Sequence, residues 1–498
     1  MGGDIVAGTN LVDSLKVFEH DPETEGIILI GELGGWAEVD AAEWIRDYKK
    51  RVKNPKPIAA ILGGVHAPAG RIMGHAGAWT STGEKTATEK LKILQDVGVT
   101  MVDHPEKFGK VMKTLLGQSG RDPNKIIQDA AQQKRGYHTS TRRPLAEMQR
   151  RARQAMHQTR SLILKSDQAP AVLEPYLSPI EGLSMTQDDA PKTGSSYISV
   201  TIDRTARQPA LATAPTSDPS QLRHRIKLFP YSYLEGPTPE TLRAALAHAQ
   251  LDAAPPAALA QTTALLTALS KMHTEKEAIT LGGAVSISPK GNGNLILHAS
   301  TLHFQFDDSA FKSANRQQDI STLRQPATED QDEVEAEADG IVYVRLHPGN
   351  PAANIGTLVN GAGLAMNTID ALQLYGSKIN TNANTTSGLA SNFLDTGGKA
   401  TSATVKKSFE LILRDPRVKV IFVNIFGGLT DGGMIAEGIL LAFKEVDMRG
   451  VPVVVRIRGT NEEVGQRIIA ESGLGLEAFD GFEEAAGRVL EIAAGSRR

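Results

Sequence analysis

The chain has 498 residues, of which 40% are hydrophobic and 22% charged, with a formal net charge of -3. This length favours about two to four domains over one, and the near-neutral charge does not indicate a nucleic acid or a membrane surface as a partner. The chain has no cysteine, which excludes disulfides, Cys-ligated zinc, iron–sulfur clusters and thiol nucleophiles. No apolar run approaches the roughly 20 residues of a membrane-spanning helix, and we expect no N-terminal targeting signal.

Residues 1–118 alternate apolar runs with segments of helical periodicity. The pattern predicts strands at 26–30 and 57–62 and helices at 37–50 and 86–97. Such alternation is typical of a parallel sheet covered by helices, so we expect an α/β domain here.

Residues 119–196 are rich in Gln, Arg, Pro and Ser and are expected to form a disordered basic linker. Within them, residues 134–160 are rich in Arg, Ser and Thr and poor in acidic residues before Glu147, a composition typical of mitochondrial transit peptides. The segment is either a solvated linker with some helix at 145–162 or the remnant of a second protein's presequence, retained when two coding units became one.

The second half of the chain contains a weak pattern followed by a strong one. Residues 197–328 show a mixed pattern, with strands expected at 197–204 and 295–302 and a helix at 239–249. The acidic run 329–340 is expected to be a second linker. Strong α/β periodicity returns in residues 341–498, with expected strands at 418–424 and 452–456 and a helix at 435–445.

Two segments carry residues suited to phosphoryl chemistry. His75 lies between glycines in a loop after the expected strand 57–62, where it can reach a phosphate, although a lone histidine is more often structural. Residues 424–428 (Asn-Ile-Phe-Gly-Gly) end a strand just before a helix, so that free N–H groups favour an anion there. The alternative for the second segment is an ordinary glycine-lined turn of a doubly wound sheet.

The N-terminal block resembles the second domain of the succinyl-CoA synthetase (succinate–CoA ligase) α subunit over residues 2–110. Four ordered motifs carry the resemblance, at Gly2–Asp13, Glu25–Gly35, Ala41–Trp44 and Gly70–Ala78. The resemblance implies that His75 takes up a phosphoryl group and passes it between nucleotide and acid, and that Glu32 hydrogen-bonds its imidazole. An acceptor of this kind fixes the tautomer and supports the developing positive charge. The alternative for Glu32 is a carboxylate favoured by the dipole of the following helix.

The C-terminal block resembles the ligase domain of the β subunit over residues 341–496. The motifs are Gly349–Met366, Asn392–Thr401, Val423–Leu429 and Val454–Asn461. The resemblance implies that this block binds the acid and the phosphohistidine through Asn360, Gly361, Gly427, Gly428 and Leu429.

Several parts of the family pattern are missing or altered. The CoA-binding domain of the α subunit has no counterpart, and only the last part of the ATP-grasp domain of the β subunit is present, at 197–328. The two expected Mg²⁺ ligands align with Gly282 and Ala299, which supply no side-chain oxygen, so we assign no metal site. An arginine frequent after the paired glycines is replaced by Asp431, which would repel an anion.

We therefore expect an α/β protein with two flavodoxin-like ligase domains, each a doubly wound parallel sheet, and a truncated ATP-grasp remnant between them. The leading function is an acid–thiol ligase that forms an acyl-CoA from a dicarboxylate through phosphohistidine and acyl phosphate, as in the tricarboxylic acid cycle. The alternative is a pseudoenzyme that binds acids or intact synthetase subunits. The family uses CoA and ATP or GTP with Mg²⁺, and independent binding of these is not expected here. The expected location is mitochondrial or cytoplasmic.

Overall fold

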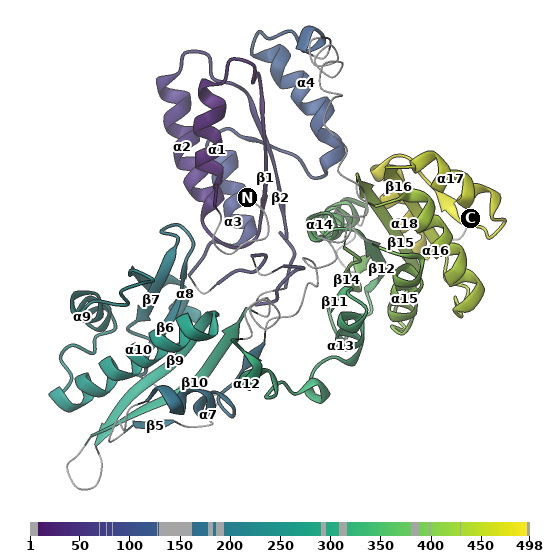
Figure 1. Ribbon diagram of the computed structural model, residues 1–498. Helices are drawn as coiled ribbons and strands as arrows, with labels where there is room; N and C mark the ends of the chain where they lie inside the picture. The colour runs from purple at the N-terminus through teal and green to yellow at the C-terminus, as the bar shows by residue number, and fades with distance from the viewer. Residues whose placement is uncertain are drawn as a thin grey trace, which may run out of the picture.

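The computed structural model describes residues 8–495 except 69, 76, 82, 127, 129–161, 178–182, 186–193, 290–294, 308–315, 380–387, 398–399 and 429. Three sheets lie in three successive parts of the chain. Figure 1 shows the N-terminal unit at the top, the second unit at the lower left and the C-terminal unit at the right. Across the described ranges, no helix has the length and apolar character needed to cross a membrane. The basic segment 134–160 lies outside the described residues.

The N-terminal unit is a three-stranded parallel sheet flanked by helices. Its strands are β1 (Ile27–Glu32), β2 (Ile58–Gly63) and β3 (Thr100–Met101), in that order. Its helices are α1 (Leu11–His20), α2 (Ala37–Arg51), α3 (Ala87–Asp96), the 3₁₀ turn η1 (Pro105–Lys107) and α4 (Phe108–Gln118). Alternate side chains of β1 are buried against α1 and α2, whereas every residue of β2 is buried. Both strands therefore follow from the apolar pattern of the sequence.

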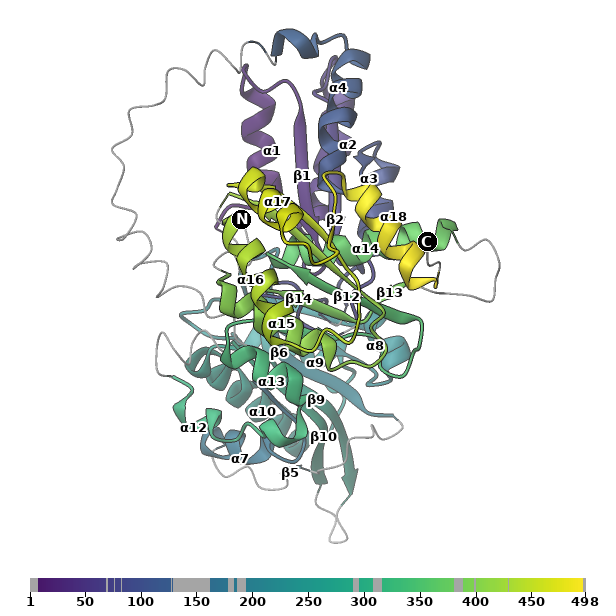
Figure 2. The same ribbon diagram turned by 90° about the vertical axis from the view of Figure 1, so that its right-hand side faces the viewer.

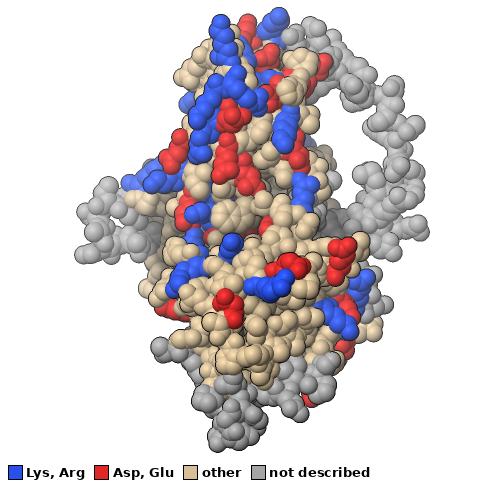
Figure 3. Space-filling model, turned by 90° about the vertical axis from the view of Figure 1, so that its left-hand side faces the viewer, with Lys and Arg blue, Asp and Glu red and all other residues tan. Residues whose placement is uncertain are grey.

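The charged side chains at the two ends of α2 complement the dipole of this helix. The first turn carries Glu38 and Asp40, and the last turn carries Lys49, Lys50 and Arg51. Each sign is placed at the helix end that stabilises it. Figure 3 shows basic and acidic groups interspersed over this unit, with basic groups gathered at its upper end.

The second unit is a mostly antiparallel seven-stranded sheet with the order β4-β10-β9-β6-β7-β8, and β5 also pairs with β10. The strands are β4 (Ile163–Leu164), β5 (Leu183–Met185), β6 (Ser196–Asp203), β7 (Gln208–Ala214), β8 (Lys227–Pro230), β9 (Ala278–Pro289) and β10 (Leu295–Phe306). The helical segments are α7 (Ala169–Leu173), η2 (Glu174–Tyr176), α8 (Pro219–Arg225), α9 (Pro239–His248), α10 (Pro256–Lys276) and α12 (Gln318–Ser321).

Residues 162–177 differ from the linker that we expected over 119–196. Leu164 pairs through β4 with β10, and Ala169 and Leu173 of α7 are buried in the core of the second unit. These apolar stretches are too short to show a periodicity of their own, which is why the sequence pattern missed them. This unit therefore begins before residue 197.

The C-terminal unit is a seven-stranded sheet with the order β11-β14-β12-β15-β16-β17, and β13 also pairs with β12. Only the pair of β11 and β14 is antiparallel among its described strands. The strands are β11 (Val342–Arg345), β12 (Ala353–Val359), β13 (Leu389–Ala390), β14 (Asn392–Asp395), β15 (Val420–Gly427), β16 (Val453–Gly459) and β17 (Glu477–Ala478). The helices are α14 (Ala362–Ile379), α15 (Ser402–Leu413), α16 (Gly432–Glu445), α17 (Glu462–Glu471) and α18 (Phe482–Ala493). The predicted α/β class with parallel sheets is confirmed.

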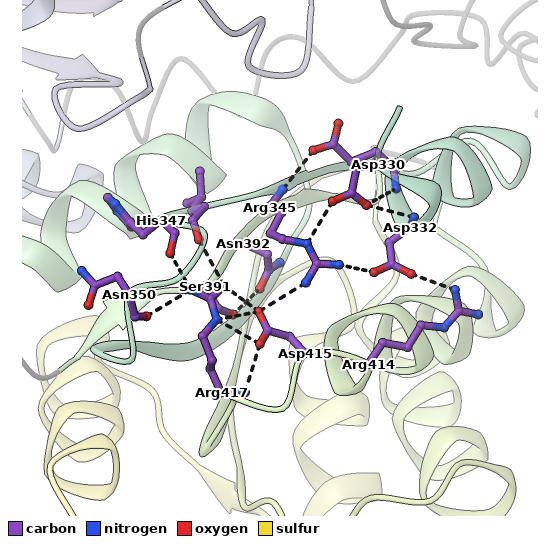
Figure 4. Close-up of polar contacts among 12 residues, drawn as sticks. Asp330, Asp332, Arg345, His347, Asn350, Ser391, Asn392, Arg414, Asp415 and Arg417 are labelled. Atoms are coloured by element: carbon purple, nitrogen blue, oxygen red, sulfur yellow. Dashed lines mark hydrogen bonds and ion pairs between the residues drawn. The ribbon is translucent and has the colours of Figure 1, made fainter. Parts of the chain in front are cut away.

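The acidic run 329–340, expected to be a linker, instead forms a docked helix. It follows η3 (Pro326–Thr328) and contains α13 (Gln331–Ala338), which contacts β11 and α15. Figure 4 shows how its carboxylates meet guanidinium groups: Arg345 Nε lies 2.9 Å from Asp330 Oδ2, and Arg414 Nη1 lies 2.9 Å from Asp332 Oδ1. Arginines distant in sequence therefore neutralise a charge run that resembles a solvated segment.

Helix α14 joins the C-terminal unit to the N-terminal unit, as Figures 1 and 2 show. Asp370 of this helix accepts hydrogen bonds from the backbone N–H groups of Gly64, Val65 and His66, at 2.8, 3.0 and 2.8 Å. Its Oδ1 also lies 3.0 Å from Nδ1 of the His66 ring. Because Asp370 is only 8% exposed, this carboxylate fixes the end of β2 to α14 in a buried setting.

Replacing Asp370 with Asn should weaken this junction. Each Asp370 oxygen accepts two donors, so either orientation of the Asn amide sets its NH₂ group against N–H groups. We expect the free energy of unfolding of the N-terminal unit to fall by about 2–4 kcal/mol. Tryptophan fluorescence during urea unfolding reports this directly, because all three tryptophans, Trp36, Trp44 and Trp79, lie in that unit. Asp447→Asn, at an exposed site, is the matched control, and an equal effect of both changes would contradict the assignment.

Candidate active site at the junction of the three units

The loop that carries His75 lies directly on the start of α14. Two hydrogen bonds of 2.9 Å fold it, from Met73 N–H to the Ala78 carbonyl and from Ala78 N–H to the His75 carbonyl. Gly74 has φ +93°, and a Cβ at this position would lie 2.3 Å from Cβ of Ala362. Glycine is therefore needed both for the left-handed backbone and for the close approach to α14.

His75 is paired with Glu32 at the end of β1. Glu32 Oε2 lies 3.2 Å from His75 Nε2, and His75 Nδ1 is buried. The two residues expected to act together are thus adjacent. Lys90, which is fully buried, fixes the backbone at Glu32. Its Nζ donates to the Glu32 carbonyl at 3.1 Å and to Glu38 Oε2 at 2.6 Å.

Side chains from the other two units hold the His75 loop. Arg71, at the start of the loop, donates to both carboxylate oxygens of Glu333 on α13, at 2.8 and 2.6 Å. Arg204, just after β6, donates to the Gly77 carbonyl at 3.2 Å, and its guanidinium lies 5.6 Å from the centre of the Trp79 ring. The sequence pattern missed these ties, because nothing local to either arginine indicates so distant a partner.

On the side expected to bind the acid, Asn360 braces the loop after β15. Its Nδ2 donates to the Phe426 carbonyl and to Thr430 Oγ1, both at 2.9 Å, and its Oδ1 accepts from Phe426 N–H at 2.9 Å. The N–H of Gly361 donates to Asp395 at 2.5 Å. Both residues therefore already use the groups expected to bind an acid, and an acid would have to displace these bonds.

Residues 427–428 face open space. Gly427 has φ +139°, and a Cβ on Gly428 would meet nothing within 4 Å. Leu429 lies outside the described residues. The next carboxylate, Asp431, is the N-cap of α16 and accepts from Met434 N–H at 3.0 Å. The hydrogen bonds that it accepts from Met434 N–H and from the Asn461 side chain lower its pKa. A fixed negative charge thus occupies the start of the helix expected to bind an anion.

A cavity of 590 Å³ joins the N-terminal and C-terminal sides. His75 and Glu32 line it from the N-terminal unit, and Leu364 of α14 and Phe426 line it from the C-terminal unit. Arg204 contributes from the second unit. The His75 loop and the end of β15 therefore face one space.

The second unit does not fit a Mg²⁺–nucleotide site built on the expected positions. A side chain at Gly282 would place its Cβ 2.2 Å from Cβ of Ser199 and 2.4 Å from the Ile198 carbonyl oxygen. Ala299 is fully buried in the apolar core of this unit. Neither position offers an oxygen ligand, and the described part of the chain holds no group of three His, Cys, Asp or Glu side chains suited to a metal.

Comparison with a family model first indicates the class of protein that the two blocks resemble. A family model described as CoA-ligase matches residues 1–100 and 358–490, the two blocks that meet at the cavity.

Curated relatives of this chain include subunits of one type of synthetase. A succinate–CoA ligase (ADP-forming) subunit beta from Paraburkholderia phytofirmans is 41% identical over 241 residues, 48% of this chain and 56% of the relative. The corresponding subunit from Burkholderia ambifaria is 39% identical over the same shares. The chain thus spans little more than half the length of these relatives. The predicted resemblance to the succinyl-CoA synthetase family is confirmed.

A solved ATP citrate lyase from Methanosaeta concilii, in complex with (3S)-citryl-CoA, aligns over 61% of this chain and 73% of its own. Its identity is 18% and its TM-score 0.43, a likeness too low to support an argument.

Removing the charge at Asp431 should strengthen anion binding. Asp431→Asn keeps the cap, because Asn is as good an N-cap as Asp, but it removes the negative charge at the helix start. We expect inorganic phosphate to bind roughly two- to fivefold more tightly, corresponding to about 0.3–1 kcal/mol. Isothermal titration at constant ionic strength measures this, with Asp447→Asn as the control for net charge. Unchanged or weaker binding would show that the anion does not bind at this helix.

Proposed function

We propose that this chain transfers a phosphoryl group between the acyl phosphate of a dicarboxylic acid and His75, as one half of an acid–thiol ligase reaction. The observation that carries the proposal is the shared cavity, in which the His75–Glu32 pair faces α14 and Phe426 of the acid-binding unit. Each half alone lacks one participant. The match of both blocks to the CoA-ligase family supports the same function.

In the proposed step, a ring nitrogen of His75 attacks the phosphorus of the acyl phosphate. The N–P bond forms as the P–O bond to the acyl group breaks, and the acid leaves as a carboxylate. The reverse step returns the phosphoryl group to the acid. Glu32 supports the positive charge that develops on the imidazole, since a carboxylate near the ring stabilises its charged form.

We further propose that thioester formation requires intact synthetase subunits as partners. The relatives are named as subunits of an ADP-forming ligase, and this chain covers 56% of their length. Gly282 and Ala299 provide no metal ligand, so nucleotide chemistry is not assigned to this chain alone. CoA and the nucleotide would then be bound by the partner.

The second candidate is a non-catalytic protein that binds acids or synthetase subunits. The specific observation in its favour is that Asn360 and the Gly361 N–H, expected to bind the acid, already bond within the C-terminal unit. In this alternative the units still pack against one another, but the chain no longer catalyses phosphoryl transfer.

Incubation of the full chain with succinyl phosphate should phosphorylate His75, whereas ATP with Mg²⁺ should not. His75 and Glu32 share a cavity with α14 and Phe426, but the expected metal ligands are missing. Mass spectrometry under alkaline conditions, which preserve phosphohistidine, measures the labelling, and His75→Asn is the control. Efficient labelling by ATP would contradict the interpretation of Gly282 and Ala299. Absence of labelling by succinyl phosphate would favour the non-catalytic alternative.

A further inference from the structure

Arg456 is a buried cation on β16, next to the end of β15. The residue is 3% exposed. Its Nη1 donates to Oδ1 of Asn424, its neighbour on β15, at 3.0 Å, and its Nε donates to the Asp480 carbonyl at 3.2 Å. Because a buried guanidinium without a counter-charge is strongly unfavourable, the source of the neutralising carboxylate decides whether Arg456 can stay in this place.

The counter-charge comes from the N-terminal unit. Among the described residues, the one carboxylate within ion-pair distance of Arg456 is that of Glu106 in η1, whose Oε2 lies 3.5 Å from Nη2. The same Oε2 accepts from the N–H of Phe482, the first residue of α18, at 2.9 Å. The N-cap of this helix, Gly481, has no side chain to cap it, so Glu106 provides the cap from the other unit.

Residues 103–107 form a docking segment through which the N-terminal unit contacts α14 and α18. The rings of His104 and Phe482 are stacked, with their centroids 3.6 Å apart. Lys107 Nζ lies 2.6 Å from Glu483 Oε1. The docking segment is therefore also held by contacts that do not involve the buried guanidinium, so docking and the positioning of that group can be changed separately.

On its other side, Arg456 fixes the end of β15 at the edge of the cavity. Asn424, which accepts from Arg456, is fully buried and donates through Nδ2 to Thr368 Oγ1 of α14 at 2.8 Å. The guanidinium also lies 6.0 Å from the centre of the Phe426 ring, which lines the cavity. A planar group that is held at several points therefore sets the geometry of this strand end.

We propose that Arg456 is a positioning residue that holds the end of β15 in place for the acyl phosphate, and that Glu106 of the N-terminal unit supplies the charge that keeps it there. The inference rests on the proposed phosphoryl transfer. Without Glu106, the guanidinium would turn toward other acceptors or toward solvent, and Asn424 and Phe426 would lose their contacts with it. Substrate binding by the C-terminal unit then depends on the docking of the N-terminal unit.

Arg456→Lys and Glu106→Gln test the two members of the pair. Lys keeps the charge but has a single nitrogen, so it cannot contact Asn424 and Glu106 as the guanidinium does. Gln keeps an oxygen for the Phe482 N–H but loses the charge. We expect each variant to raise the succinyl phosphate concentration for half-maximal labelling roughly tenfold, while the maximal labelling rate changes less than about threefold.

Glu483→Gln is the matched control, because it removes a charge that faces the same docking segment, at Lys107, but does not touch Arg456. This variant should label like the wild type. Wild-type half-maximal concentrations in both Arg456→Lys and Glu106→Gln would overturn the proposal. An equal rise in Glu483→Gln would also overturn it, since docking alone would then explain the effect. If Arg456→Lys does not fold, Glu106→Gln carries the test, because the Glu106 side chain is 45% exposed.

The double variant of Arg456→Lys and Glu106→Gln tests whether the two residues act together. If Glu106 acts through Arg456, the half-maximal concentration in the double variant should rise no further than in the more affected single variant. A rise equal to the product of the two single rises would show that the residues act independently, and the proposal would be wrong.

A binding measurement does not depend on labelling. In isothermal titration, inorganic phosphate should bind roughly three- to tenfold more weakly to Arg456→Lys and Glu106→Gln, and as in the wild type to Glu483→Gln. If the wild type binds phosphate but is never labelled by succinyl phosphate, the proposed function fails, while this pattern of affinities would still establish Arg456 as a positioning residue of the anion site. Equal phosphate affinities in the wild type and all variants would reduce Arg456 to a structural residue.

Discussion

The site depends on one carboxylate, Asp370, which accepts three successive backbone N–H groups at the end of β2. These groups belong to a strand end whose donors would otherwise be left without partners in a buried junction. These three hydrogen bonds fix α14 against the point where the chain leaves β2 and enters the His75 loop. The start of α14 then lies against Gly74, so the His75 loop and the C-terminal unit share one surface.

Around this junction, each unit contributes a different constraint on the same loop. The N-terminal unit supplies the His75–Glu32 pair, the acidic helix α13 holds Arg71 through Glu333, and the second unit reaches Gly77 through Arg204. A unit without metal ligands at the expected positions therefore still has a structural function at the site. Because charge-assisted bonds hold this loop from three sides, we expect its backbone to keep one geometry and to move little.

The elements that could be predicted from the sequence are those that depend on short-range patterns of residues. Strands β1 and β2 and helix α2 follow from hydrophobic periodicity, and the adjacency of His75 and Glu32 was expected from the resemblance alone. Prediction from the sequence failed where a segment depends on partners elsewhere in the chain. The acidic run that contains α13 resembled a linker because the arginines that neutralise it lie on other elements. Helix α10 was missed because it is buried on more than one side and shows no single apolar stripe. Asp370 had no local signal, since the N–H groups that it binds belong to another segment.

Trapping the junction with a disulfide tests the account most directly, because the chain contains no other cysteine. A Cβ at Gly63 would lie 3.7 Å from Cβ of Met366, within the roughly 3.5–4.5 Å that a disulfide requires. Under mild oxidation, the double variant Gly63→Cys and Met366→Cys should lose both thiols and yield one intramolecular cross-linked peptide by mass spectrometry, whereas each single variant keeps its thiol. Two free thiols in the oxidised double variant, or only intermolecular dimers, would show that β2 and α14 do not meet and that the shared site is not formed.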